Sequence, residues 1–132
     1  MNYYISKQVP LEFDQAVEAV TAALKNEGMG VLTEIDVQAT LKEKLDVDFR
    51  RYRILGACHP PSAYEALLAE ERIGVLLPCN VMVQETRSGA VEIAAIDPLA
   101  AMGMLENPRL TAVATQIRDR LRRVLDATGP VS

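Results

Sequence analysis

The sequence has no tryptophan, one histidine and only two cysteines. Two cysteines cannot supply a disulfide framework, and no four-ligand zinc spacing is present. Aromatic residues make up only 5% of the chain, and the net charge is −4. This composition argues against a nucleic-acid-binding module, which would need a basic surface and aromatic stacking platforms.

Long apolar runs are also missing from the chain. None reaches the ~18 residues that a membrane span needs, and residues 1–10 lack the basic start and apolar run of a signal peptide. We therefore expect a soluble, cytoplasmic protein with reduced thiols and no membrane partner. The length of 132 residues and the hydrophobic content of 49% suit a single domain over residues 1–132.

Apolar periodicity divides the chain into strands and helices. Alternation predicts strands over residues 2–9, 30–37, 51–58, 75–87 and 90–97. Helical spacing predicts helices over residues 11–27, 38–45, 62–71 and 99–105, and a last helix that begins at Pro108 after an Asn107 cap. This order favours an α+β fold: a five-stranded, mainly antiparallel sheet with helices packed on one face.

The two cysteines follow the apolar residues of their strands. Alternation places Cys58 on one face with Ile54, and Cys79 on one face with Val81. A free cysteine is among the most buried residue types and packs as a small hydrophobe. Inert core thiols are therefore the simplest interpretation.

A chemical site is the alternative for the same residues. Thiolate and imidazole ligands suit zinc or copper, so Cys58, His59 and Cys79 are candidate metal ligands. Possible thioether ligands, which suit Cu(I), are Met82, Met102 and Met104. The two cysteines could instead form a redox pair, provided that their Cα atoms lie within about 7 Å. No cofactor can be assigned from these residues.

Two carboxylates lie two positions apart on the second predicted strand. Glu34 and Asp36 share the face opposite the expected inward residues Val31, Thr33 and Ile35. They could act as a general acid–base pair if a pocket enclosed them. Asp36 could equally cap the helix over residues 38–45. We assign no catalytic residue, because the chain has neither a Ser-His-Asp order nor a glycine-rich phosphate loop.

Charged residues near the C-terminus have a structural interpretation as well. On the last predicted helix, the arginines spread over the side opposite the apolar stripe, which predicts a solvated outer face; they are Arg118, Arg120, Arg122 and Arg123. A phosphate or acidic partner is the alternative. Asp97-Pro98 is expected to cap a turn and to end the fifth strand.

Several longer segments resemble a known family. They are GMGVLTEIDVQATLKEKL over residues 28–45, YRILGACHPPSAYEALLAE over 52–70, IGVLLPCNVMV over 73–83 and IDP over 96–98. Together they resemble the family called domain of unknown function 302. Gly56, Ala57, Cys58 and Pro60 match the family's Gly-Ala-Cys-x-Pro. Residues 78–81 match its Pro-Cys-Asn-Val, whereas His59 stands where members usually carry Asn.

The resemblance implies a TBP-like fold with a β-α-β(4)-α core and a homodimer, but no established activity. The leading hypothesis is therefore a non-catalytic protein that binds a small molecule or a partner, with Cys58, Cys79 and Asn80 as candidate ligand-binding residues. The alternatives are a thiol-based copper, zinc or redox protein that uses Cys58 and Cys79, and an enzyme with a carboxylate base at Glu34 or Asp36. The departure at His59 weakens any mechanism that needs an imidazole there.

Overall fold

Five antiparallel strands form one sheet in the computed structural model, which describes residues 2–129. The strands follow the order β1-β5-β4-β3-β2 across the sheet. Their bounds are Tyr4–Val9 for β1, Gly30–Asp36 for β2, Tyr52–Cys58 for β3, Cys79–Glu85 for β4 and Val91–Ile96 for β5. The predicted α+β class and the antiparallel sheet are confirmed.

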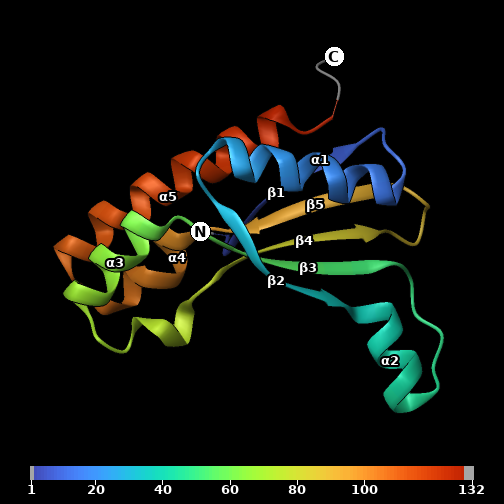
Figure 1. Ribbon diagram of the computed structural model, residues 1–132, viewed down its shortest axis with the longest axis horizontal. Coiled ribbons are helices and arrows are strands. Elements are labelled where there is room, and N and C mark those ends of the chain that lie inside the picture. The colour runs from blue at the N-terminus through green and yellow to red at the C-terminus, as the bar shows by residue number, and fades with distance from the viewer. Residues whose placement is uncertain (1, 130–132) are drawn as a thin grey trace.

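Two long helices, α1 (Phe13–Asn26) and α5 (Pro108–Ala127), run along the sheet and pack against each other. The shorter α3 (Pro60–Ala69) and α4 (Pro98–Met102) gather at one end beside α5, while α2 (Val37–Leu45) projects at the opposite end (Figure 1). Two 3-10 turns, η1 (Ile73–Leu76) and η2 (Gly103–Leu105), complete the described elements. With α2, α3 and α4 counted as insertions, the order fits the expected β-α-β(4)-α core.

The core lies between the sheet and the two long helices. Side chains of α1 and α5 that face the sheet are buried, among them Val20, Leu24 and Leu121. The strands contribute Val81 and Ile93, which alternate with half-buried residues on the other face. Burial of these aliphatic side chains stabilises the fold by roughly 25 cal/mol per Å² of apolar surface removed from water.

Local capping residues set several helix starts. Asn107 Oδ1 accepts hydrogen bonds from the backbone N–H groups of Arg109 (3.0 Å) and Leu110 (3.4 Å), as the Asn-Pro signal predicted. Asp36 accepts a hydrogen bond from the Ala39 N–H at 2.9 Å and caps α2. The prediction that Asp36 caps this helix is confirmed.

The prediction for the second strand was wrong about its inward face. Val31 is half-buried, but Thr33 and Ile35 are exposed. The pairing of β2 with β3 shifts between Val31 and Thr33, so alternation does not continue through the strand. In addition, β2 is an edge strand, and therefore has less of the molecule packed against it.

On the third strand, the residues that face the helices are not the set that contains Ile54, with which Cys58 was grouped from the sequence. Leu55 and Ala57 are buried and lie directly opposite Val81 and Cys79, whereas Ile54 lies opposite Met82 on the other face. Both faces of this strand carry apolar side chains. Alternation alone could not identify the core face, because a shift of one residue exchanges the two faces.

The predicted strand over residues 75–87 begins too early. Residues 73–76 form the 3-10 turn η1, and β4 starts at Cys79. Pro78 has no N–H to donate to a strand ladder, so it marks the start of pairing rather than an interior position. No helix within residues 2–129 is long and apolar enough to cross a membrane.

Candidate functional site

A pocket of about 320 Å³ lies where β3, α3 and β4 meet, and it contains both cysteines and the histidine. We call it the thiol pocket. Its lining is almost entirely apolar. Met29, Ala57, Cys79 and Ile117 line it as buried residues, while the exposed side chains of Leu32 and Leu67 extend its apolar lining toward solvent.

Cys58 and Cys79 line one pocket because their strands are neighbours in the sheet. Cys58 is the last residue of β3 and Cys79 is the first residue of β4, and Cys79 pairs directly with Ala57. Cys79 is buried, whereas Cys58 is half-buried. Burial, together with the nearby Cys58 thiol, raises the pKa of Cys79 to about 11. The Cys79 thiol is therefore protonated at neutral pH.

His59 occupies the N-cap position of α3, immediately before Pro60 and Pro61. Its Nδ1 makes a 2.6 Å hydrogen bond with Oγ of the buried Ser62. The ring also lies beside Gly28, where a built Cβ would be 3.3 Å from His59 Cδ2. Burial and, secondarily, the positive charge of Arg120 lower the pKa of His59, so the imidazole is neutral at pH 7.

The three candidate metal ligands do not form a metal centre in this arrangement. Among residues 2–129, no group of three or more His, Cys, Asp or Glu side chains is placed to hold a metal ion. The thioethers considered from the sequence also lie elsewhere: Met82 lines a groove on the other face of the sheet, Met102 is buried in the core and Met104 is exposed. Met29 is the methionine in the thiol pocket.

Asn80 does not share a site with the cysteines. It is exposed and lines an open groove of about 480 Å³ on the sheet face that carries Ile54 and Met82. We call this surface the sheet groove. Tyr4 and Tyr52 also line it. The three candidate ligand-binding residues are therefore divided between two concave surfaces on opposite faces of the sheet.

Polar side chains bridge the strands along the sheet groove. Gln84 Nε2 donates a hydrogen bond to Glu92 Oε1 at 2.8 Å, and Gln84 Oε1 accepts one from Arg50 Nε at 2.9 Å. Arg50 and Glu92 carry opposite charges, so their charges balance along this chain of hydrogen bonds. Arg50 also lies over the ring of Phe49, 4.3 Å from its centroid.

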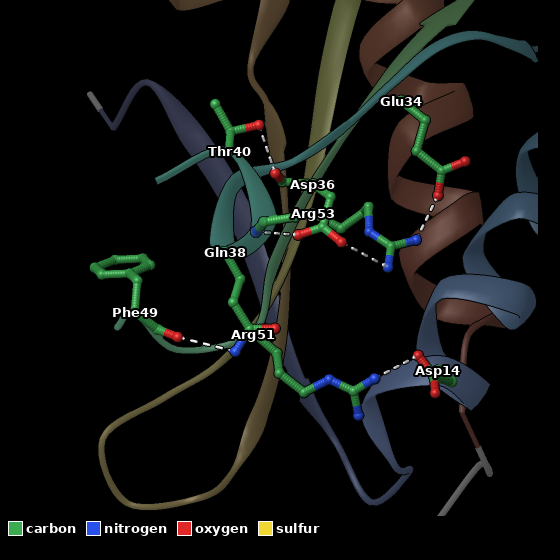
Figure 2. A network of polar contacts seen from close by, with 9 residues as sticks. Asp14, Glu34, Asp36, Gln38, Thr40, Phe49, Arg51 and Arg53 are labelled. Carbon is green, nitrogen blue, oxygen red and sulfur yellow. Dashed lines mark hydrogen bonds and ion pairs between the residues drawn. The ribbon is translucent and has the colours of Figure 1, made fainter. Parts of the chain in front are cut away.

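Glu34 and Asp36 form ion pairs instead of lining either cavity. Arg53 Nη1 lies 2.7 Å from Glu34 Oε1, and Arg53 Nη2 lies 3.7 Å from Asp36 Oδ2. Figure 2 shows the Arg53 guanidinium between these carboxylates, with Arg51 reaching Asp14 of α1 nearby. These ion pairs join the edge strand β2 to β3, and neither carboxylate is enclosed as the acid–base hypothesis requires.

Most of the C-terminal arginines are engaged within the fold. Arg118 Nε donates to Asp97 Oδ2 at 3.1 Å, and Asp97 is buried. Arg120 donates to the backbone oxygen of Glu27 at 2.7 Å, and Arg123 donates to the Glu27 side chain at 2.9 Å. The predicted solvated basic face fits Arg122 and Arg123, which are exposed. Arg118 and Arg120 are half-buried, because the helix turns them toward neighbouring elements.

A family model described as "Domain of unknown function DUF302" matches residues 5–128. The chain belongs to the DUF302 family. A similar solved structure is that of an uncharacterized conserved DUF302 protein from Bacillus stearothermophilus, which is 30% identical to this chain. The alignment covers 97% of this DUF302 chain and 99% of the other, with a TM-score of 0.91. No curated protein matches the chain.

The sequence segments that suggested the family converge on the thiol pocket. Cys58 and Cys79 come from the Gly-Ala-Cys-x-Pro and Pro-Cys-Asn-Val segments, and Pro78 lines the same pocket. Sequence reasoning missed three lining residues: Met29 and Leu67, which lie in two of those segments, and Ile117, which comes from α5 of this DUF302 chain. The one available signal was that these residues are apolar, and that property does not distinguish a pocket lining from the core.

Proposed function

We propose that this protein binds a small, uncharged and mainly apolar molecule in the thiol pocket. The observation that carries the proposal is the lining, in which thiols and aliphatic side chains surround about 320 Å³ of space. This volume is at the lower end of the range for small-molecule sites. An apolar ligand would gain roughly 25 cal/mol for each Å² of apolar surface buried there.

The charge of the surroundings supports an uncharged ligand. The lining residues that the structure describes include no Asp, Glu, Lys or Arg. A charged ligand would lose its hydration without gaining a counter-ion, which is unfavourable in an apolar environment. His59 is neutral at pH 7 and is the lining residue that could hydrogen-bond to a polar atom of the ligand.

A filling substitution tests the proposal. Ala63 of α3 lines the thiol pocket and is half-buried, so Ala63→Leu places extra carbon atoms in the space without opening the core. The probe is N-phenyl-1-naphthylamine, an uncharged apolar dye whose fluorescence rises in apolar surroundings. We expect saturable binding to the wild-type chain and binding weaker by about tenfold in Ala63→Leu, which corresponds to about 1.4 kcal/mol.

Ala39→Leu is the matched control, because Ala39 is exposed on α2 at the other end of the molecule. It should bind the dye as the wild-type chain does. Circular dichroism establishes that both variants are folded. Unchanged dye affinity in a folded Ala63→Leu variant would contradict the proposal, as would an equal loss in both variants.

A second proposal concerns the sheet groove, through which two copies of this chain would associate as a homodimer. Ile54, Met82 and Ala94 form a row across the three central strands and are half-buried within one chain. Apolar side chains gathered on one face favour association. Glu92 is the one charged residue among the groove's described lining residues. Gln84 links it by hydrogen bonds to the positively charged Arg50, so repulsion between two identical faces would be small.

Sedimentation velocity at micromolar concentration tests the homodimer. Met82→Lys would place two ammonium groups in the proposed interface, so we expect a dimeric wild-type chain and a monomeric variant. Val75→Lys is the control, because Val75 is 86% exposed on η1 and lies outside the groove. A monomeric wild-type chain, or a Met82→Lys variant that remains dimeric, would refute this proposal.

We also place the protein in the cytoplasm. Both cysteines are free, and a reducing compartment preserves free thiols. Fractionation of cells that produce the full chain tests this localisation, and recovery outside the cytoplasmic fraction would contradict it.

A further inference from the structure

His59 is the residue of the thiol pocket that is suited to change its charge near neutral pH. It is the single histidine of the chain, it is half-buried, and it lines the pocket. A ligand in the pocket therefore covers part of the imidazole ring that water reaches in the free chain. Removing water from a charged group is unfavourable, so a bound apolar ligand disfavours the imidazolium form.

The surroundings of the ring within α3 also favour its neutral form. His59 is the N-cap residue of α3, and the helix dipole disfavours a positive charge at a helix N-terminus. Its Nδ1 lies 2.6 Å from Oγ of Ser62, which is only 4% exposed. A neutral ring can accept the Ser62 hydroxyl proton at Nδ1, whereas an imidazolium can only donate. Protonation would therefore leave the buried Ser62 hydroxyl without this acceptor.

The charged side chains near the ring come from α5 and from the connection between α1 and β2. Arg120 of α5 contributes positive charge, and its Nη1 donates to the backbone oxygen of Glu27 at 2.7 Å. The Glu27 carboxylate lies 2.9 Å from Arg123 Nε and 3.8 Å from Arg120 Nη1, so two arginines balance this one acidic group. On the strand side, the titratable groups of the lining are the thiols of Cys58 and Cys79. Burial and, secondarily, the charge of Arg120 lower the pKa of the imidazole.

We propose that protonation of His59 releases the apolar ligand from the thiol pocket, so that pH regulates binding at this site. This regulation rests on the ligand-binding function proposed above. Because the ligand binds more tightly to the chain with a neutral imidazole, its affinity is full above pH 6.5 and decreases as the pH falls through the pKa of His59. The coupling is reciprocal, so a bound ligand lowers the pKa of His59 further.

Titrations of the full chain with N-phenyl-1-naphthylamine at about pH 7.5, 6.5, 5.5 and 5.0 test the proposal. The weakly basic nitrogen of this dye stays unprotonated over the whole range. We expect little change between the two higher values, and below the pKa of His59 a loss of affinity that approaches tenfold for each pH unit. Circular dichroism at each pH establishes that the chain is folded.

His59→Asn is the matched variant, because Asn is uncharged at every pH of the series and is a favourable N-cap residue. It should bind the dye with the same affinity throughout the series. A folded His59→Asn variant that loses affinity in acid as the wild-type chain does would overturn the proposal, since another group would then be responsible.

The single histidine also allows a direct measurement on the wild-type chain. The NMR chemical shift of the imidazole Hε1 proton, followed against pH, gives the pKa of His59 without dye and with saturating dye. We expect the dye to lower this pKa by about one pH unit for each tenfold difference in affinity between the neutral and the protonated chain. This measurement decides the proposal even if His59→Asn does not fold.

The possible outcomes separate the pH regulation from the ligand-binding function. A chain that shows no saturable dye binding at neutral pH would refute the binding function, and the regulation with it. Saturable binding with the same affinity at every pH of the series would refute the regulation alone. A His59 pKa that saturating dye leaves unchanged would do the same.

Discussion

Pro78 lies directly against the backbone of Gly56. A Cβ built on Gly56 would be 2.7 Å from Pro78 Cγ and would also overlap Thr33 Oγ1. Gly56 is on the central part of β3, so side chains from both neighbouring strand segments close over it. The absence of a side chain at this position is what allows the Pro78 ring to approach and to form part of the thiol pocket.

Gly56→Ala should destabilise the fold by about 2 kcal/mol, because the rigid Pro78 ring cannot move away without disturbing the start of β4. Urea denaturation measures the loss. Gly30→Ala is the control, since Gly30 lies on β2 and a Cβ there meets nothing within 4 Å. A Gly56→Ala variant as stable as Gly30→Ala would show that this packing is less tight than described.

Cys79 should make the folded state sensitive to alkaline pH. Its folded pKa of about 11 is above its ordinary value of 9.0, so the folded chain holds this proton more tightly than the unfolded chain. The stability that the folded chain gains by holding this proton more tightly is fully present below pH 9 and is lost as the pH rises toward about 11. The loss should approach about 2–3 kcal/mol.

The free energy of unfolding at pH 8 and at about pH 10.5 measures this effect. In Cys79→Ala the alkaline loss should be smaller than in the wild-type chain, while titration of lysines and tyrosines affects both chains alike. Equal losses in the two chains would mean that Cys79 does not hold its proton as its burial implies.

His59 should produce the opposite dependence on the acid side. Burial and Arg120 lower its pKa below the ordinary value of 6.5, so protonation favours the unfolded chain. The stability is present above pH 6.5 and decreases as the pH falls below that value. His59→Asn should therefore show a smaller change in the urea midpoint between about pH 7.5 and about pH 5.5. Parallel changes in the two chains would contradict this explanation.

Arg118 should be needed to balance the buried charge of Asp97. Arg118 Nε lies 3.1 Å from Asp97 Oδ2, and the Asp97 side chain is only 5% exposed. Arg118→Met leaves that carboxylate buried without its partner, at a cost of about 3 kcal/mol. Arg122→Met is the matched control, because Arg122 is exposed on the same helix. Equal urea midpoints for the two variants would refute this role for Arg118.

The sequence by itself determined the features that depend on nearby residues. The apolar stripe of α5 and its Asn107 cap act over one or two helical turns, so spacing predicted them correctly. Alternation also predicted the strand over residues 2–9, and in β1 Val9 is buried while Ser6 is exposed. Alternation also indicates that Cys79 and Asn80 cannot share a site, because they are consecutive in a strand and consecutive side chains point to opposite faces.

Only the tertiary structure decided which surfaces those elements form. Leu55 and Ile54 are both apolar, and the choice of Leu55 for the core depends on the pairing of β3 with β4 and on the helices above the sheet. The thiol pocket depends on still longer-range contacts, since Met29 reaches it from the connection between α1 and β2, and Ile117 reaches it from α5. Local periodicity cannot provide such information, because a pocket is formed by residues whose separation along the chain has no fixed period.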